Sequence, residues 1–284
     1  MGLNPAAESE VRGRLRRVTS RQNSLVKDLR QAFQRSELTS DGYCALEGQH
    51  LAEEAIRSGL RFKAVFFSDE AGSRIEKLLP QISSQAEALI LPDDVFRSAV
   101  NTETPQGIAA LVKWPETKAE QVFSRENPLL VGAVGLQDPG NLGTVIRSAE
   151  AFGAAGMLLG EKTVSEFNSK AIRASAGSAF RVPLIHLDLA VVEDLRGRGV
   201  RLLATSSHKG TPIDEADLTG GVALMIGNEG AGLPRDYMAR VDETVRIPQS
   251  DRVESLNAGI AASIILYEAA RQRRSSEKKP AEQA

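Results

Sequence analysis

The sequence has few of the residues that build disulfides or metal sites. Of its 284 residues, one is cysteine and three are histidine. Cys44 alone cannot form an internal disulfide. His50, His186 and His208 lie far apart, with no thiol or carboxylate at metal-ligand spacing around them. We therefore predict neither a disulfide nor a metal site.

Long apolar runs and a strong net charge are also lacking. No stretch is long and apolar enough to cross a bilayer, and residues 1–17 lack the apolar centre of a secretory signal. We therefore expect a soluble, cytoplasmic protein. The 35 basic and 37 acidic side chains give a formal net charge of −2. No global positive field thus points to nucleic acid, and any basic surface must be local.

The length and the 42% hydrophobic content suffice for two domains, each with its own core. In the first half, apolar periodicity predicts helices at 24–35, around 51–56 and at 75–79, and strands at 43–46, 64–67, 88–91 and 107–112. The segment 114–127 is polar and weakly periodic. We therefore expect a flexible basic tail (1–17), a small α/β domain (18–113), a linker (114–127), a second domain (128–273) and a flexible tail (274–284).

The second half repeats the alternation of strands and helices. We expect strands at 129–134, 157–159, 200–205, 222–226 and 244–247, and helices at 142–152, 169–175, 190–198 and 256–271. This order predicts an α/β fold with a largely parallel sheet, covered on both faces, that binds ligands at the carboxyl ends of its strands. The last helix is apolar on nearly all sides, which is typical of a core or a subunit interface.

Three loops of the second half follow strands directly and concentrate glycine, amide and charged side chains. They are 138–143 with Arg147 behind it, 227–232, and 248–257. None is a standard nucleotide motif. A phosphate-binding P-loop would need Lys-Ser/Thr after its last glycine, and the dinucleotide pattern would need a glycine where Arg235 stands. ATP and NAD are therefore poor candidates.

Taken singly, the polar residues of these loops also have ordinary structural interpretations. Asn141 suits the N-cap of a helix that carries a solvated Arg147, and Glu229 suits a turn in water. Ser255 and Asn257 suit the cap and start of the last helix. A functional interpretation rests on the three loops together.

In combination and order, these loops closely resemble the SpoU (TrmH-like) branch of the SPOUT RNA methyltransferases, over about 129–273. The three family motifs are matched by Asp138-Pro-Gly-Asn141-Leu-Gly143-Thr-Val-Ile-Arg147-Ser-Ala, Leu224-Met-Ile-Gly227-Asn-Glu229-Gly-Ala-Gly232-Leu, and Ile247-Pro248 followed by Glu254-Ser255-Leu256-Asn257-Ala258. The first half resembles, more loosely, the α/β substrate-binding domain that often precedes this domain, at Ser20-Arg21-Gln22-Asn23 and Leu46-Glu47-Gly48.

The resemblance implies a C-terminal trefoil knot, a rare feature, and a pocket for the methyl donor S-adenosylmethionine. By similarity, the donor is held by Thr205, Ser206, Ile226, Gly227, Gly232, Ile247, Leu256 and Ala258. The implied catalytic and RNA-facing set is Asn141, Arg147, Glu229, Ser255 and Asn257. The sequence departs from the family in two places. Residues 249–252 replace the usual Met-x-Gly, which bears on the shape of the loop expected to hold the donor, and Ala258 replaces the usual valine.

The implied activity is methylation of a ribose 2′-hydroxyl, with large-subunit ribosomal RNA as the first expected substrate and transfer RNA as the second. The resemblance also implies a homodimer that pairs through the last helix. Alternatives are a non-catalytic RNA-binding protein and a SPOUT enzyme that methylates a base. Two basic runs are candidate phosphate contacts: Arg12, Arg14, Arg16, Arg17 and Arg21 near one end, and Arg271, Arg273, Arg274, Lys278 and Lys279 near the other.

Overall fold

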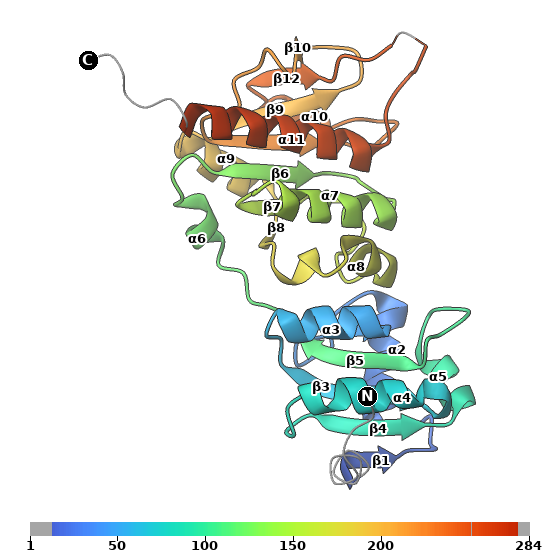
Figure 1. Ribbon diagram of the computed structural model, residues 1–284. Helices are drawn as coiled ribbons and strands as arrows, with labels where there is room; N and C mark the ends of the chain where they lie inside the picture. Colours follow the sequence, from blue (N-terminus) through green and yellow to red (C-terminus); the bar gives the residue numbers. More distant parts are fainter. Residues whose placement is uncertain (1–12, 251, 278–284) are drawn as a thin grey trace. The chain divides into compact units, whose positions relative to one another are not determined.

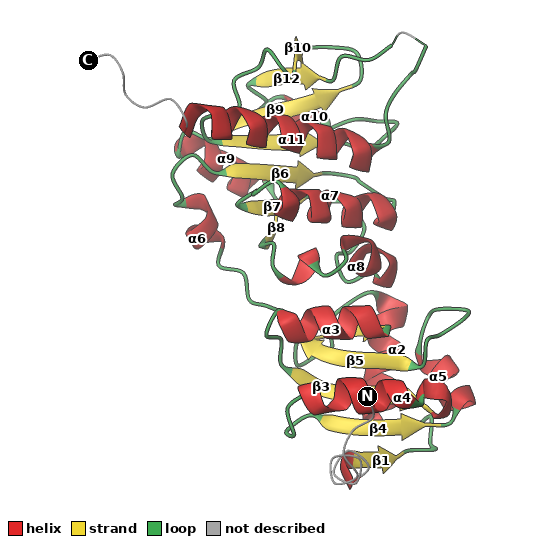
Figure 2. Ribbon diagram, in the orientation of Figure 1, coloured by secondary structure: helices red, strands yellow, loops and turns green. Residues whose placement is uncertain are grey.

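The computed structural model describes residues 13–250 and 252–277, which divide into two units (Figure 1). Unit 1 runs to Glu116 and also takes in Phe167–Phe180. Unit 2 comprises Thr117–Glu166 and the chain from Arg181 onward. Each unit has its own β-sheet with helices on its faces, as Figure 2 shows.

The sheet of unit 1 has five strands in the order β1-β4-β3-β5-β2. β1, β4 and β3 run parallel, whereas β5 is antiparallel to both of its neighbours. The strands are β1 Leu15–Arg17, β2 Tyr43–Glu47, β3 Phe62–Ser68, β4 Glu87–Leu91 and β5 Ile108–Lys113. The four strands that the sequence predicts here, β2 to β5, are confirmed within two residues.

Two apolar clusters sandwich this sheet. The α3, α4 and α8 helices pack on one face, and α2 and α5 pack on the other. The helices of unit 1 are α2 Ser24–Arg35, α3 Gln49–Arg57, α4 Ser73–Leu78, α5 Asp93–Ala99 and α8 Ser169–Ser175, with short 3-10 helices at Asp69–Ala71, Leu79–Gln81 and Ser178–Phe180. Asn23 caps α2, because its side-chain oxygen accepts a hydrogen bond of 3.0 Å from the Leu25 amide.

The expectation of a flexible tail over 1–17 is wrong for its last residues. Leu15–Arg17 form β1, which pairs in parallel with β4. Arg14 anchors the segment by donating to the backbone carbonyls of Leu79, Ile82 and Ser83 at 2.8–3.0 Å. Residues 1–12, and the tail residues 278–284, lie outside the described part of the chain.

The sheet of unit 2 has seven parallel strands in the order β10-β12-β9-β11-β6-β7-β8. The strands are β6 Leu129–Ala133, β7 Gly156–Leu159, β8 Leu184–His186, β9 Arg201–Ser206, β10 Thr211–Pro212, β11 Val222–Ile226 and β12 Glu243–Arg246. The predicted largely parallel α/β sheet is confirmed. Sequence patterns did not indicate β8 or β10, which have only three and two residues.

Helices cover both faces of this sheet (Figure 1). The helices are α6 Ala119–Phe123, α7 Pro139–Ala151, α9 Leu189–Gly197, α10 Arg235–Met238 and α11 Ala258–Glu277. The α6, α9 and α10 helices share one apolar cluster, while α7 and α11 pack against each other. The α7–α11 contact is close: a Cβ on Gly259 would lie 3.0 Å from Thr144 Cβ, and the hydroxyls of Ser148 and Ser263 are 2.6 Å apart.

Three further details differ from expectation. The N-cap of α7 is Asp138, which accepts a hydrogen bond of 2.8 Å from the Asn141 amide, so Asn141 lies inside the first turn. The segment 114–127, expected as a linker, contains α6 with its buried Val122 and Phe123. The last helix begins at Ala258 rather than Leu256 and continues to Glu277, into the expected tail.

Candidate active site

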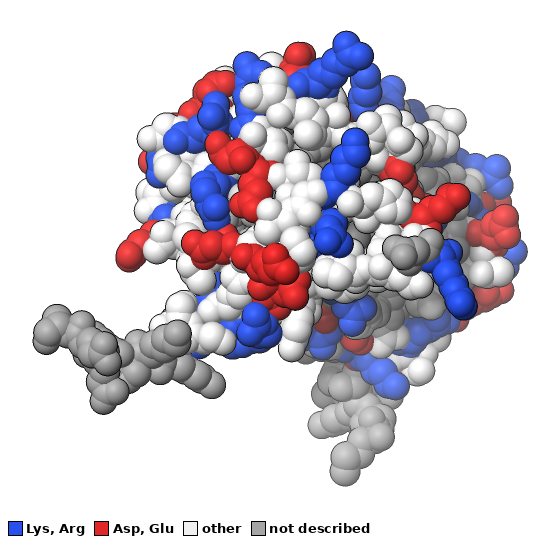
Figure 3. Space-filling model, turned by 90° about the horizontal axis from the view of Figure 1, so that it is seen from above, with Lys and Arg blue, Asp and Glu red and all other residues white. Residues whose placement is uncertain are grey.

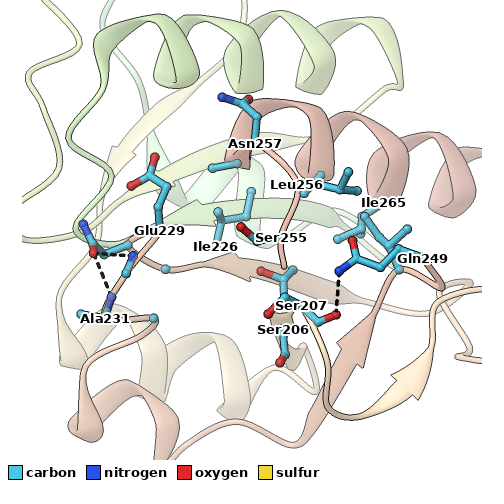
Figure 4. A pocket seen from close by; sticks show the side chains of 18 residues that line it. Ser206, Ser207, Ile226, Glu229, Ala231, Gln249, Ser255, Leu256, Asn257 and Ile265 are labelled. Atoms are coloured by element: carbon cyan, nitrogen blue, oxygen red, sulfur yellow. Dashed lines mark hydrogen bonds between the residues drawn. The ribbon is translucent and has the colours of Figure 1, made fainter. Parts of the chain in front are cut away.

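Three loops of unit 2 converge at the carboxyl edge of its sheet and line a cavity of about 490 Å³ (Figure 4). They follow β9, β11 and β12, which are adjacent in the sheet. The volume lies in the usual range for small-molecule pockets. A ligand site at this edge is where a parallel α/β sheet is expected to have one.

The cavity gathers most of the residues that the sequence singled out. All eight predicted donor-binding residues line it, namely Thr205, Ser206, Ile226, Gly227, Gly232, Ile247, Leu256 and Ala258. Three of the five predicted catalytic residues, Glu229, Ser255 and Asn257, line it as well. The remaining two, Asn141 and Arg147, lie on α7.

A hydrogen-bonded relay joins three residues from the three motifs. Asn257 donates from its side-chain amide to Asn141 Oδ1 at 2.8 Å, and Asn141 donates in turn to Glu229 Oε1 at 2.9 Å. The other end of the Asn257 side chain accepts from the amides of Gly259 and Ile260 at the start of α11. Asn257 therefore serves as a helix cap and a member of the relay at once.

Arg147 differs from the other four predicted residues. Its side chain is exposed, it does not line the cavity, and no hydrogen bond or ion pair joins it to the rest of the described chain. It shares α7 with Asn141, which places both on one rigid element. The guanidinium is thus free to meet an anion supplied by a substrate.

Asn228 shapes the loop after β11, although the sequence did not single it out. Its side-chain oxygen accepts from the amides of Gly230 and Ala231 at 3.0 Å, and its side-chain nitrogen donates to the Gly135 carbonyl at 3.0 Å. The loop folds so tightly that a Cβ on Gly227 would lie 2.3 Å from the carbonyl carbon of Gly232. Glycine is therefore required at 227. An amide directly after that glycine is the signal that could have identified Asn228.

Gln249 also lines the cavity without having been predicted as a site residue. Its side-chain amide donates to the Ser207 carbonyl at 3.3 Å (Figure 4). The same amide donates to the Val253 carbonyl at 3.4 Å. The loops after β9 and β12 are thereby tied together. The sequence signal that could have identified Gln249 is the departure from the family motif at 249–252.

The chemistry of the lining fits S-adenosylmethionine better than a polyphosphate. Among the described lining residues there is no lysine, arginine or histidine, and Glu229 supplies one carboxylate. A triphosphate would lack a cationic partner there, whereas a sulfonium cation would not be repelled. The aliphatic side chains of Ile226, Ile247 and Leu256 suit a flat purine, and the loop amides and hydroxyls supply hydrogen bonds.

No comparable constellation for a metal occurs in the part of the chain that the structure describes, where no group of three histidine, cysteine or acidic side chains is disposed to hold an ion. None of the helices within 13–250 and 252–277 is both long and apolar enough to span a bilayer.

On the face of the molecule in Figure 3, basic and acidic side chains are interspersed, as the near-neutral net charge leads one to expect.

Comparison with known proteins identifies the family. Residues 128–267 match the model of the SpoU rRNA Methylase family, and residues 23–110 match the MRM3-like substrate binding domain. The 23S rRNA (guanosine(2553)-2′-O)-methyltransferase RlmP of Bacillus subtilis is 34% identical over 254 residues, which are 89% of this chain and 98% of that protein. The 23S rRNA (uridine(2479)-2′-O)-methyltransferase of Streptomyces viridochromogenes is 30% identical over 91% of this chain and 93% of its own length.

Solved structures agree with these relatives. The AdoMet-bound rRNA methyltransferase from Sinorhizobium meliloti superimposes with a TM-score of 0.79 at 29% identity, covering 91% of this chain and 98% of that one. The likeness extends through both units rather than through the methylase domain alone. The chain therefore belongs to the SpoU rRNA methylase family.

Proposed function

We propose that this protein transfers a methyl group from S-adenosylmethionine to a ribose 2′-hydroxyl of large-subunit ribosomal RNA. The observation that carries the proposal is the cavity at the carboxyl edge of the sheet, where the relay of Asn257, Asn141 and Glu229 joins a lining that holds no cation among the described residues. The two relatives named as 23S rRNA 2′-O-methyltransferases support the choice of RNA and of the ribose.

When bound, S-adenosylmethionine supplies an electrophilic methyl group. The protein must place the ribose oxygen in line with that group and stabilise the charge that develops as the hydroxyl loses its proton. We assign the second task to Arg147. A guanidinium stays protonated in proteins, so Arg147 suits the stabilisation of a forming alkoxide and the binding of the adjacent phosphate better than the role of a base.

The relay residues have a positioning role in this proposal. Asn141 fixes one carboxylate oxygen of Glu229 at the rim of the cavity, and Asn257 ties both to α11. Ser255 lies two residues before Asn257 and lines the same cavity. Together they would orient the target nucleotide and the donor loops, while the proton leaves through water.

We further propose that unit 1 holds the RNA and that the protein acts in the cytoplasm as a homodimer. The match of residues 23–110 to a substrate-binding domain supports the first part. The homodimer is supported by an apolar stripe on α11 that is exposed to solvent. Its residues lie at helical spacing and are Ile260, Ile264 and Tyr267. The family relationship also supports a trefoil knot in the C-terminal segment of unit 2.

Ligand binding tests the donor site directly. A ligand that binds only the native state stabilises it by mass action, by about 2.7 kcal/mol at a hundred times Kd. Titration calorimetry and thermal melting should show binding of S-adenosylmethionine and of its demethylated product, and none of ATP or NAD. Absence of both heat and thermal shift at millimolar donor would contradict the proposal.

The substrate requires a separate experiment. Ribosomal and transfer RNA from cells with and without the protein should be digested to nucleosides, separated and weighed by mass spectrometry. The expected result is one 2′-O-methylated nucleoside of the large-subunit RNA that disappears with the protein. A methylated base, a change only in transfer RNA, or no change would each overturn the substrate as stated.

A further inference from the structure

One end of the unit 1 sheet gathers three cations around a single aromatic ring. Lys63 Nζ and Lys113 Nζ each lie 5.4 Å from the centre of the Tyr43 ring, and Arg61 Cζ lies 6.0 Å from it. We call these four residues the Tyr43 cluster. Strand pairing fixes their approach, because Tyr43 is opposite Lys113 in the ladder of β2 and β5. The Lys113 amide also donates to the Arg61 carbonyl at 2.7 Å.

Only one of the three cations is neutralised by carboxylates. Lys63 forms ion pairs with Asp28 at 3.0 Å and Asp41 at 2.8 Å. Lys113 instead donates to the backbone carbonyl of Asp41, and Arg61 donates to the Tyr43 hydroxyl. Neither of these two cations has an acidic partner among the described residues. The three cations outnumber the two carboxylates, so the cluster keeps an excess of positive charge that favours the arrival of an anion.

A polar hollow of about 160 Å³ adjoins the Tyr43 cluster. It is lined by Asp28, Gln31, Ala32, Arg35, Glu37, Leu38, Thr39 and Ser40. Asp28 belongs to both features, since it lines the hollow and pairs with Lys63. Thr39 links them as well: its hydroxyl donates to Asp41 at 2.6 Å and accepts from the Tyr43 amide at 3.0 Å.

Of the basic residues in the two sequence runs that the structure describes, all except Arg274 already donate to carboxylates or backbone carbonyls. Arg16, Arg17 and Arg21 pair with Glu87, Asp69 and Asp94. Arg271 pairs with Glu268, while Arg273 donates to backbone carbonyls. These cations are largely committed to contacts within the chain. The Tyr43 cluster takes its charges from β2, β3 and β5, so no run in the sequence reveals it.

We propose that the Tyr43 cluster and its hollow bind an unpaired nucleotide of the RNA substrate, with a phosphate at Arg61 and Lys113 and the base in the hollow. The proposal rests on the proposed RNA methylation. Sequence-specific contacts to RNA favour unpaired nucleotides whose base edges can be hydrogen-bonded, and Gln31, Arg35 and Ser40 supply such partners. Cations beside an aromatic ring are the usual surroundings of a bound single strand.

The test compares two double variants with equal change in charge. Arg61→Gln/Lys113→Gln removes the unpaired cations, whereas the control Arg16→Gln/Arg21→Gln removes cations that already have acidic partners. The affinity for a fragment of the substrate RNA is measured against salt. Losing the contact to one phosphate should reduce the slope of log K against log salt by about 0.7 to 0.9. The control should change it by less than half as much, with the affinity for S-adenosylmethionine unchanged in both.

A third variant tests the hollow. Ser40→Phe places a ring where the base would lie and should weaken RNA binding about tenfold without changing the salt slope. An equal slope change in both double variants, or in neither, would overturn the phosphate site, and unchanged affinity of Ser40→Phe would overturn the base site. A parent protein that fails to methylate RNA would overturn the proposed function instead, so the two failures are distinguishable.

Discussion

The hydrogen bond between Asn141 and Glu229 allows a test at the scale of one atom. Asn141→Asp replaces the donor nitrogen with an oxygen and sets two carboxylates 2.9 Å apart, where their charges repel. We expect kcat to fall at least tenfold while the fold survives, because the site is at the rim of the cavity. Single-turnover methylation and circular dichroism check this. Full activity would show that the relay only shapes the loops.

Arg147 allows a second prediction at this scale. Arg147→Lys keeps the positive charge but loses the planar fork that can grip an alkoxide and a phosphate together. We expect methyl transfer to slow about a hundredfold, as for removal of one donor from an oxyanion site. The affinity for S-adenosylmethionine should not change, because Arg147 does not line the cavity. A variant with parental kcat would exclude a required guanidinium; Arg198→Lys, on a surface ion-pair network of unit 2, is the matched control.

The buried carboxyl group of Glu47 makes the stability of the fold depend on pH. Burial raises the pKa of this carboxyl, which is 7% exposed and accepts a hydrogen bond of 2.6 Å from Thr102. Its contribution to folding is therefore complete below the ordinary glutamate pKa and is lost as the pH rises through the raised value. Relative to the parent, Glu47→Gln should gain stability as the pH rises above the ordinary glutamate pKa. Urea unfolding followed by fluorescence of Trp114, the single tryptophan, which packs in unit 1, measures it.

Asp94 provides the control of opposite sign. The hydrogen bond from Arg21 lowers the pKa of the Asp94 carboxyl, so its contribution is present above the ordinary aspartate pKa and is lost on acidification. Asp94→Asn should lose stability relative to the parent as the pH rises, by a small amount because the pair is exposed. Parallel pH profiles for the two variants would contradict the assignment of Glu47.

At the scale of elements, α11 divides between a buried and an exposed face. Ile265 is 2% exposed and lines the donor cavity, whereas Ile264 is 38% exposed. We expect Ile264→Arg to yield a folded monomer, because the charge lies on the proposed dimer surface. Ile265→Arg should instead unfold unit 2 or abolish donor binding, because it buries an unpaired charge. Light scattering with circular dichroism distinguishes the outcomes, and a fully dimeric Ile264→Arg variant would rule out this interface.

Sequence patterns predicted the longer elements of both units because their apolar faces repeat over many residues. They missed α5, α6, α10, β8 and β10, which are short, and β1, whose Leu-Arg-Arg sequence has no apolar alternation. β1 exists through tertiary contacts, namely its pairing with β4 and the anchoring of Arg14 on distant carbonyls. Such contacts join residues more than 60 positions apart, which local pattern does not encode.

The identity of the site residues was more predictable from the sequence than the way in which they contact one another. The second and third family motifs contain most of the residues that line the cavity, because each follows a strand and parallel strands end at one edge. The first motif adds none, and Thr205 and Ser206 come from the loop after β9. The relay itself was not predictable, since its two hydrogen bonds span 116 and 88 residues. Asn141 shows the limit clearly: its residue type suits an N-cap, but Asp138 takes that position and frees the Asn141 side chain.

At the scale of the whole molecule, the chain does not divide into two consecutive domains. Phe167–Phe180 follows β7 of unit 2 in sequence yet belongs to unit 1. Ile172 and Phe180 join the same apolar cluster as α3 and α4, and the Trp114 ring contacts those of Phe167 and Phe180 at centroid distances of 5.0 and 6.1 Å. Unit 1 therefore depends on a segment that lies within the matched methylase region.

This arrangement gives the last prediction. Phe180 is 4% exposed, and Phe180→Ala should destabilise unit 1 by about 3 to 5 kcal/mol, the usual cost of a buried phenylalanine. Phe123→Ala, the same substitution in the core of unit 2, is the matched control. The Phe180 variant should lower the urea midpoint reported by Trp114 fluorescence and leave the affinity for S-adenosylmethionine intact, because the donor cavity lies in unit 2. The Phe123 variant should leave the urea midpoint reported by Trp114 unchanged and weaken the binding of S-adenosylmethionine. If Phe180→Ala left the Trp114 transition unchanged, the segment would not be part of the core of unit 1; if it abolished donor binding at an unchanged midpoint, the segment would serve the methylase unit instead.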